Sequence, residues 1–302
     1  MVDGVSVELN ELIALKRFVR RVKYKPEYSA VQAGNHLSKL RGRGMDFAEV
    51  RNYQAGDEIR HMEWRVTART GRPHVKIYQE ERERPVVILS DFNPSMYFGT
   101  RIAFKSVVAA RLAALITWTV VSQGDRVGGL FFSAEEHHEF TPRSRETGAL
   151  PLLSSLSQYT NVTTNKNQKT KPLSEILIRL RRVTRPGSIV VLISDFYNLD
   201  ADCEKHLSRL HLHNDVLAYH ICDPLELAPP KPAHYAMTNG EHEILLDTTS
   251  KGVARAYQSY CEQRVANLEA QFKRLKTQYV QVTAQEDLSR LVRQTFPRRS
   301  RV

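Results

Sequence analysis

Two apolar runs that end in the same tripeptide constrain the fold of this chain more than any other feature. The runs at 86–89 (VVIL) and 189–193 (IVVLI) are each followed by Ser-Asp-Phe. Runs this short and this apolar are typical of strands that are buried on both faces, as in a parallel sheet. Each strand is therefore predicted to end at an acidic side chain, Asp91 in the first and Asp195 in the second.

Short apolar runs alternate with helical patterns along most of the chain. The predicted class is α/β, with a mostly parallel, Rossmann-type central sheet covered by helices on both faces and preceded by a small β-rich subdomain. Residues 26–46 are rich in Gly and basic side chains and are predicted to form a loop. Strands are predicted at 74–78, 86–89, 127–132, 139–141, 189–193, 216–221, 243–246 and 279–282, and helices at 9–25, 104–121, 148–156, 173–183, 203–211 and 253–276.

The net charge of +11 is compatible with a nucleic acid, an anionic membrane surface or an acidic protein as partner. The basic residues are spread along the chain, and many stand beside acids, which favours an ordinary solvated surface. No zinc-finger spacing and no RNA-recognition signature are present in the sequence. Binding to nucleic acid or to an anionic surface is therefore kept as an alternative.

The longest apolar stretch, 107–121, is interrupted by Arg111 and is predicted to be a buried helix, so no membrane span is expected. The N-terminal segment lacks the apolar core of a secretory signal. Three widely spaced cysteines, an odd number, indicate free thiols in a reducing compartment. We therefore expect a cytoplasmic protein.

Oxygen-bearing side chains gather after the first of the two strands. Asp91, Asn93 and Ser95 stand at alternate positions, and Asp195 follows a second strand of the same sheet. Ligands of such sheets bind at the carboxyl ends of the strands, and Mg²⁺ prefers oxygen ligands that include one or two carboxylates. These residues predict a Mg²⁺ site. The structural alternative is that they cap a helix and form Asx turns.

A dense run of opposite charges precedes the sheet region. Arginine forks match carboxylates in a bidentate manner, so the simplest interpretation is an internal ion-pair network that stabilises the small subdomain. The alternative is that part of the run faces a protein partner. The residues assigned to this run are Glu49, Arg51, Asp57, Arg60, Trp64 and Arg69.

Catalytic signals are weak. The sequence has no GxxxxGK[ST] phosphate loop and no GxSxG elbow, and no histidine is predicted at a strand end beside Asp91 or Asp195. A metal-dependent hydrolase would need a general base near the metal. We therefore expect a protein that is not an enzyme and has no catalytic residues, with a hydrolase as the less favoured rival.

The strand-end pattern resembles the metal-ion-dependent adhesion site of von Willebrand factor A domains, whose first motif is Asp-x-Ser-x-Ser. Asp91, Ser95 and Asp195 match that pattern, whereas Asn93 departs from it because serine is usual there. A metal-free remnant of the site that still binds a partner is therefore kept as an alternative to a bound Mg²⁺. In that family a threonine from a later loop completes the site. Among Thr163, Thr164 and Thr170, the resemblance favours Thr170, which lies closest to the helix predicted from 173.

The flanking sequence resembles a bacterial family more specifically. The block GRGMDFAEVRNYQAGDEIRHMEWRVTARTGRPHVKIYQEERERPVVILSDFNPSMYFGT, residues 42–100, is similar to the "domain of unknown function 58" family. That family carries a von Willebrand A-like domain and often accompanies MoxR-type AAA+ ATPases.

The resemblance implies an adaptor or co-chaperone that works with a MoxR-type ATPase on client proteins. Its bound Mg²⁺ would leave one coordination position for a carboxylate of the partner. The expected organisation is an N-terminal helix with the small β-rich subdomain at 1–83, a von Willebrand A-like domain at 84–285, and a helix end with a basic tail at 286–302.

Overall fold

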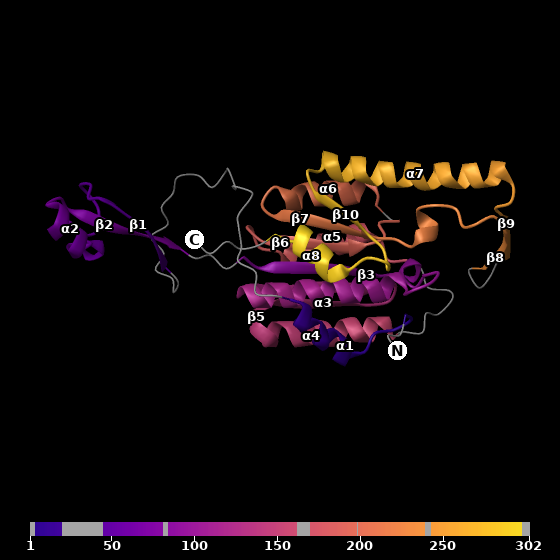
Figure 1. Cartoon of the computed structure of the whole chain (residues 1–302), viewed down its shortest axis with the longest axis horizontal. Helices are drawn as coiled ribbons and strands as arrows, with labels where there is room; N and C mark the ends of the chain where they lie inside the picture. The colour runs from indigo at the N-terminus through magenta and orange to yellow at the C-terminus, as the bar shows by residue number, and fades with distance from the viewer. Residues whose placement is uncertain are drawn as a thin grey trace. The chain divides into compact units, whose positions relative to one another are not determined.

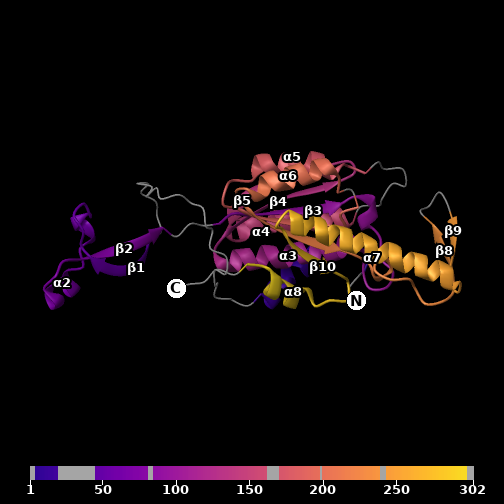
Figure 2. The ribbon, with the colours of Figure 1, turned by 90° about the horizontal axis from the view of Figure 1, so that it is seen from above.

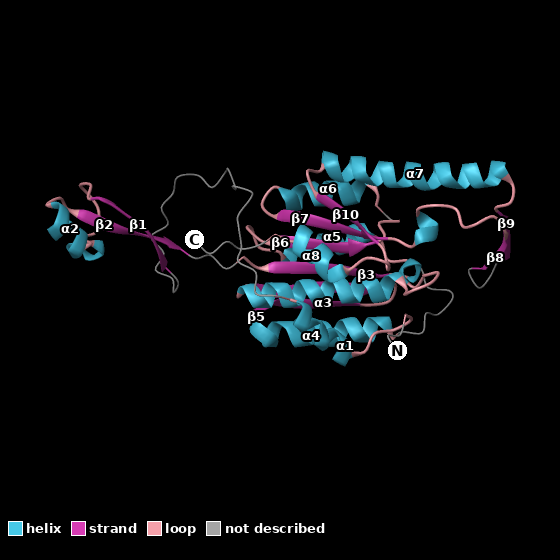
Figure 3. Cartoon of the chain, in the orientation of Figure 1, coloured by secondary structure: helices cyan, strands magenta, loops and turns pink. Residues whose placement is uncertain are grey.

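The computed structural model describes residues 4–19, 45–80, 84–161, 170–197, 199–238 and 243–297. The chain divides into two compact units, one formed by Met1–Pro26 with Arg84–Val302 and the other by Glu27–Glu83. The larger unit holds a central sheet between helices, and the smaller holds a two-stranded sheet with a short helix (Figure 1, Figure 3).

The central sheet confirms the predicted α/β class. Its order is β10-β7-β6-β3-β4-β5, and every neighbouring pair is parallel except β4 with β5. The predicted strands are present with small changes in their ends. Their bounds are β3 Val86–Phe92, β4 Arg126–Ser133, β5 His137–Ser144, β6 Ile189–Ser194, β7 Asp215–Ile221 and β10 Gln278–Val282.

Helices cover both faces of the sheet because successive strand residues point to opposite sides. In β3, Val86 and Ile88 belong to one apolar core, and Val87 and Leu89 belong to the other. The helices on the two sides are visible in Figure 2. The first core contains α1 Leu9–Ala14, α3 Lys105–Gln123, α4 Arg145–Thr160 and α8 Leu288–Thr295; the second contains α5 Leu173–Val183, α6 Ala201–His211 and the last turns of α7 Lys251–Arg274.

Helix α3 is the central element of the first core. Among the described residues it alone is long and apolar enough to cross a membrane, but 72% of its most apolar window is buried inside the unit. The indole Nε1 of Trp118 donates to the carbonyl of Leu12 at 2.9 Å, which ties α3 to the N-terminal helix. The prediction that this stretch is a buried helix agrees with the packing. The cytoplasmic location stays a prediction.

The order of the strands creates a switch point beside β3. From β3 the chain passes through α3 to β4 on one side, and it later returns to β6 on the other side. The connections that leave β3 and β6 cover opposite faces, so a crevice forms where their carboxyl ends meet. Asp91 lies near the end of β3, and Asp195 directly follows β6.

The ends of the chain pack differently from the expected organisation. A helix was predicted at 9–25, but α1 ends at Ala14 and a 3₁₀ helix follows at Leu15–Phe18; residues 20–25 and the loop residues 26–44 lie outside the described residues. Leu12 is buried in the first core, so the N-terminal helix packs with the α/β unit instead of with the small subdomain.

The C-terminal segment also joins the α/β unit. The segment predicted as a helix end contains a separate helix, α8, which buries Val292 and Phe296 in the first core. The apolar face of this helix is what holds it on the unit. The basic tail at 298–302 lies outside the described residues.

The small unit pairs β1 Met45–Asn52 with β2 His74–Glu80 in antiparallel fashion, and it also contains α2 Trp64–Thr70, which was not predicted. The expected ion pairing is present in part, because Arg51 Nη2 lies 2.7 Å from Asp57 Oδ1. Arg60, Trp64 and Arg69 are exposed, and the side chain of Glu49 lies outside the described side chains.

A hairpin precedes the long helix α7. It consists of β8 His234–Thr238, which was not predicted, and β9 Glu243–Asp247, and the pair lies beyond the start of α7 (Figure 1). The three cysteines, Cys203, Cys222 and Cys261, are free and buried, as their spacing indicated.

We expect Ile116→Ala in α3 to lower the free energy of unfolding by about 2–5 kcal/mol, because it leaves a cavity in a close-packed core. Ile116 is fully buried, whereas Ile178 on α5 is exposed. Urea unfolding followed by circular dichroism would measure the difference. The matched control Ile178→Ala should change stability far less, and equal losses in the two variants would contradict the packing described for α3.

Candidate functional site

The two acidic side chains predicted at the strand ends lie at the switch point of the sheet. Ser90 of β3 pairs with Ile193 of β6, so Asp91 and Asp195 follow neighbouring strands one and two residues beyond this pair. Both acids are buried. The register of the two parallel strands places the two acids at the same edge of the sheet.

Both carboxylate oxygens of Asp91 accept hydrogen bonds. The backbone N–H of Asn93 donates to Oδ1 at 2.8 Å, and the hydroxyl of Ser194 donates to Oδ2 at 2.7 Å. Burial, and to a lesser extent the negative charge of Asp195, raise the pKa of Asp91 to about 7. The two hydrogen bonds and the Lys105 ammonium act in the opposite direction.

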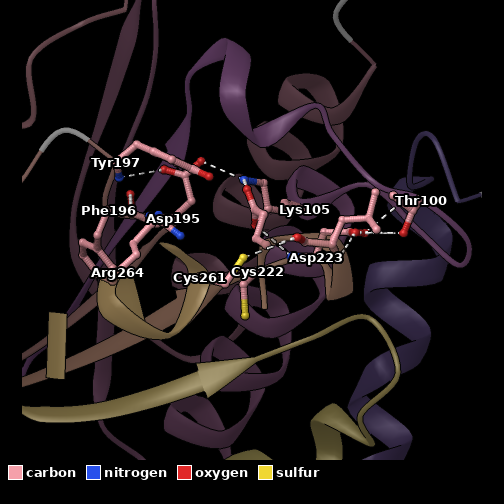
Figure 4. Close-up of polar contacts among 12 residues, drawn as sticks. Thr100, Lys105, Asp195, Phe196, Tyr197, Cys222, Asp223, Cys261 and Arg264 are labelled. Carbon is pink, nitrogen blue, oxygen red and sulfur yellow. Dashed lines mark hydrogen bonds and ion pairs between the residues drawn. The ribbon is translucent and has the colours of Figure 1, made fainter. Parts of the chain in front are cut away.

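Asp195 is bound by a buried lysine. Nζ of Lys105, the first residue of α3, lies 3.0 Å from Asp195 Oδ2 and 2.7 Å from Glu226 Oε1 (Figure 4). Only 2% of Lys105 is exposed. Buried charges persist where they are paired and hydrogen-bonded. The ammonium therefore supplies the positive charge that two of the carboxylates at this edge require.

A capping motif holds Glu226 in place for this contact. The chain after β7 forms a capping box, in which the backbone N–H of Asp223 donates to Glu226 Oε2 at 2.8 Å. The Asp223 carboxylate accepts from the backbone N–H and the hydroxyl of Thr100, in the loop before α3 (Figure 4). The loop after β7 and the start of α3 are thereby fixed together around Lys105.

An aromatic side chain covers the ion network. The Nζ of Lys105 lies 5.2 Å from the ring centroid of Tyr197, and the Arg264 guanidinium of α7 lies 3.7 Å from the same centroid. Arg264 Nη2 also donates to the backbone carbonyl of Asp195 at 2.8 Å (Figure 4). Cations are attracted to the faces of aromatic rings at such distances. Tyr197 is 45% exposed, so its outer side faces solvent.

The backbone beside Asp195 adopts an unusual conformation. Phe196 has φ of +52°, in the left-handed region that bulky residues rarely occupy. This turn lets the N–H of Tyr197 donate to Asp195 Oδ1 and the N–H of Phe196 donate to Ser194 Oγ. The Phe196 ring is buried against Phe272 of α7. Such conformations persist only where the surroundings enforce them, and they concentrate at functional sites.

The other predicted ligands are arranged less favourably. Both polar atoms of the Asn93 side chain bind the backbone of Lys171: Oδ1 accepts from its N–H at 3.0 Å, and Nδ2 donates to its carbonyl at 3.3 Å. Ser95 Oγ is buried without a hydrogen-bond partner among the described residues. Thr170 is exposed, and the other two threonines considered, Thr163 and Thr164, lie outside the described residues.

These contacts do not fit a bound Mg²⁺ well. Magnesium requires near-ideal octahedral geometry with oxygen ligands. The Asn93 amide binds the backbone of Lys171, and the Asp195 carboxylate pairs with the Lys105 ammonium. The Ser95 hydroxyl has no hydrogen-bond partner among the described residues. Within the described ranges, no group of three or more His, Cys, Asp or Glu side chains is arranged to hold a metal ion. The structural alternative is met in part: Asp91 Oδ1 accepts from the N–H of Asn93 in an Asx turn, but the Asn93 side chain makes no capping hydrogen bond to the short helix that follows.

One expectation about histidine was wrong. His220 near the end of β7 pairs with Ser194 of β6, so a histidine does lie at a strand end beside Asp195. It is fully buried and shares a 2.6 Å hydrogen bond between its Nδ1 and the hydroxyl of Tyr279. Burial lowers the pKa of His220 to about 3, with a smaller contribution from the charge of Arg264. A neutral imidazole walled off from solvent is poorly placed to serve as a general base.

Three residues of the network were not found by sequence reasoning, and two of them left signals. Lys105 stands in the first turn of an apolar helix, where a positive charge opposes the helix dipole. Glu226 is the third residue after Asp223, which is the spacing of a capping box directly behind a strand. Arg264 is one of many basic residues on α7, and no local pattern distinguishes it.

The strand order and the helices on both faces of the sheet define an α/β protein with a mostly parallel central sheet, as the resemblance implied. The model of the family described as "Protein of unknown function DUF58" matches residues 49–267. The chain belongs to this family.

This chain is also similar to other proteins and to solved structures. Uncharacterized proteins of Mycobacterium tuberculosis and Mycobacterium bovis are each 28% identical over 221 residues, which cover 73% of this chain and 68% of theirs. Among solved structures, the conserved hypothetical protein BatB from Bacteroides thetaiotaomicron is 17% identical, with a TM-score of 0.42 over 70% of this chain and 96% of its own. The SpRpn10 VWA domain is 12% identical, with a TM-score of 0.39 over 73% and 99%.

We expect acid to destabilise the protein through His220. A folded-state pKa below the ordinary value means that the contribution to stability is present above about pH 6.5 and is lost as the pH falls toward 3. The free energy of unfolding should fall by up to about 1.4 kcal/mol per pH unit in this range. His220→Gln, whose amide does not titrate, should flatten the slope measured by urea unfolding between pH 6.5 and 4.5.

The exposed His213 supplies the matched control. His213→Gln should leave the slope of the wild type unchanged. A slope in His220→Gln as steep as that of the wild type would show that His220 is not the group responsible.

Proposed function

We propose that this protein is a non-enzymatic adaptor that docks a protein partner at the carboxyl edge of its central sheet. By family resemblance, the partner we propose is a MoxR-type AAA+ ATPase, with which the adaptor would act on client proteins in the cytoplasm. The observation that carries the proposal is a buried, ion-paired network directly beneath the exposed ring of Tyr197. Such an edge offers a rigid surface for binding, and its Asp91 and Asp195 carboxylates are already engaged in hydrogen bonds.

One exposed side chain, Tyr197, contacts Lys105, and another, Ile102, precedes Lys105 by three residues in the chain. Ile102, in the loop between Thr100 and α3, is 54% exposed, and Tyr197, whose ring covers the Lys105 ammonium, is 45% exposed. Tyrosine and other large side chains on a rigid support are typical anchors of protein interfaces. We call Ile102 and Tyr197 the strand-end surface. Its rigidity is supported by the hydrogen bonds of Thr100 to Asp223 and by the Lys105 pairs.

The hydrolase alternative is disfavoured by the chemistry of the edge. A hydrolase needs an activated water and a base within hydrogen-bond reach of it. Both oxygens of Asp91 and of Asp195 already accept hydrogen bonds, and His220 is fully buried. The described strand-end residues therefore support recognition better than turnover.

The nucleic-acid alternative rests on the net charge of +11 alone. Binding of that kind weakens steeply as salt rises, because condensed counterions are released from the phosphates. An interface built on Ile102 and Tyr197 depends mainly on burying apolar surface, which salt affects little. The dependence of binding on salt concentration therefore distinguishes the two alternatives.

We expect Tyr197→Ala and Ile102→Glu each to weaken binding of the purified MoxR-type ATPase from the same genome at least about tenfold, because each removes an anchor at the centre of the interface. Isothermal titration calorimetry at low and at moderate salt would measure the affinity. Thermal unfolding of each variant would show that the fold is retained.

Leu212 supplies the matched control, because it is 73% exposed and follows α6 at the opposite, amino edge of the sheet. Leu212→Glu should bind like the wild type. Equal weakening by Leu212→Glu would place the interface elsewhere. Binding that collapses with salt and is insensitive to Tyr197→Ala would favour the nucleic-acid alternative.

A further inference from the structure

We propose that Lys105 is the resident cation of the strand-end site and that the site holds no divalent metal. This proposal deepens the docking function proposed above, and its consequence for partner binding rests on that function. Its structural part concerns the isolated protein alone.

A lysine is unfavourable at the position of Lys105 unless neighbouring groups compensate its charge. It is the first residue of the 19-residue helix α3, where the helix dipole disfavours positive charge. Its side chain is also almost fully buried, which costs solvation and the freedom of a long side chain. A residue without a positive charge and a long side chain would cost less free energy at the first position of a helix. The two carboxylates that it contacts supply the compensation.

The ammonium sits where it can neutralise acids from two different strand ends. Asp195 follows β6, and Glu226 follows β7 through the capping box. The distances from Nζ, 3.0 Å and 2.7 Å, are those of charge-assisted hydrogen bonds. The same charge also lowers the pKa of Asp91, so its field reaches the third carboxylate of the edge.

A divalent cation would have to compete with this arrangement. Added positive charge beside a buried ammonium is repelled strongly, because a buried site screens charges poorly. Most of the oxygens that could bind the metal already accept hydrogen bonds: both of Asp91, both of Asp195 and the amide oxygen of Asn93.

The unpartnered Ser95 hydroxyl favours a bound metal instead. It is buried and lies within the motif that the family resemblance associates with a metal. A single hydroxyl does not replace the carboxylates that a hard cation prefers. The charges of the site and the hydrogen bonds of its oxygens therefore indicate that Lys105, and not a metal ion, is the cation of the site.

The direct test is a titration of the purified wild-type protein with Mn²⁺, which takes the same oxygen ligands as Mg²⁺ and is counted by electron paramagnetic resonance. We expect no stoichiometric binding at millimolar Mn²⁺, and an unfolding temperature that neither Mg²⁺ nor EDTA changes. One Mn²⁺ bound per chain, or an unfolding temperature lowered by EDTA, would overturn the proposal.

A second test asks whether Lys105 neutralises the carboxylates. Lys105→Met keeps the length of the side chain but leaves Asp195 and Glu226 without their cation. We expect its unfolding temperature to fall by several degrees or more. The double variant Lys105→Met with Glu226→Gln should recover part of that loss, since one uncompensated charge is removed. A double variant no more stable than Lys105→Met would contradict the assignment.

Lys171 provides a matched control, because it lies beside the same edge and contacts no carboxylate among the described residues. Lys171→Met should change the unfolding temperature little. Partner binding separates this proposal from the proposed function: EDTA should leave the affinity of the wild type for the ATPase unchanged. Binding abolished by EDTA would refute the metal-free site while leaving docking intact, whereas binding insensitive to Tyr197→Ala would refute the docking surface alone.

Discussion

The contact of Lys105 with Asp195 and Glu226 is the interaction on which the carboxyl edge of the sheet depends. Parallel strands bring several acids to one edge, and their mutual repulsion has to be compensated inside a buried site. One ammonium, delivered by the first turn of α3, compensates two of them directly and a third through its field. The packing of α3 in the first core therefore also determines the electrostatics of the edge.

Other features of the edge follow from this requirement. The capping box after β7 orients Glu226, and the Thr100 contacts to Asp223 fix the loop that leads into α3. The left-handed turn at Phe196 aims two backbone N–H groups at the side chains of Ser194 and Asp195. Each of these hydrogen bonds removes one acceptor from contact with water. The result is a buried polar layer in which the carboxylates of Asp91 and Asp195 are hydrogen-bonded on both oxygens, which favours a single conformation.

The fold was largely predictable from sequence, because apolar strands that alternate with helical patterns admit few architectures. The runs at 86–89 and 189–193 correctly placed Asp91 and Asp195 at neighbouring strand ends. The partners of these acids were not predictable from spacing alone. Lys105 meets Asp195, 90 residues away, and Glu226 meets Lys105 only through tertiary packing. Short segments such as α2 and α8 were missed because their helical patterns span only about two turns.

A polar layer of this kind bears on how the edge is used. Catalysis requires groups that change their protonation or ligation during a cycle, whereas the groups here are held by partners on several elements. The exposed parts of the same edge are Ile102 and the outer side of Tyr197, and the Tyr197 ring is supported by Lys105 and Arg264. A rigid support reduces the entropy lost when such a side chain is covered by a partner. The charge balance that holds this edge together therefore also suits it to the docking proposed above.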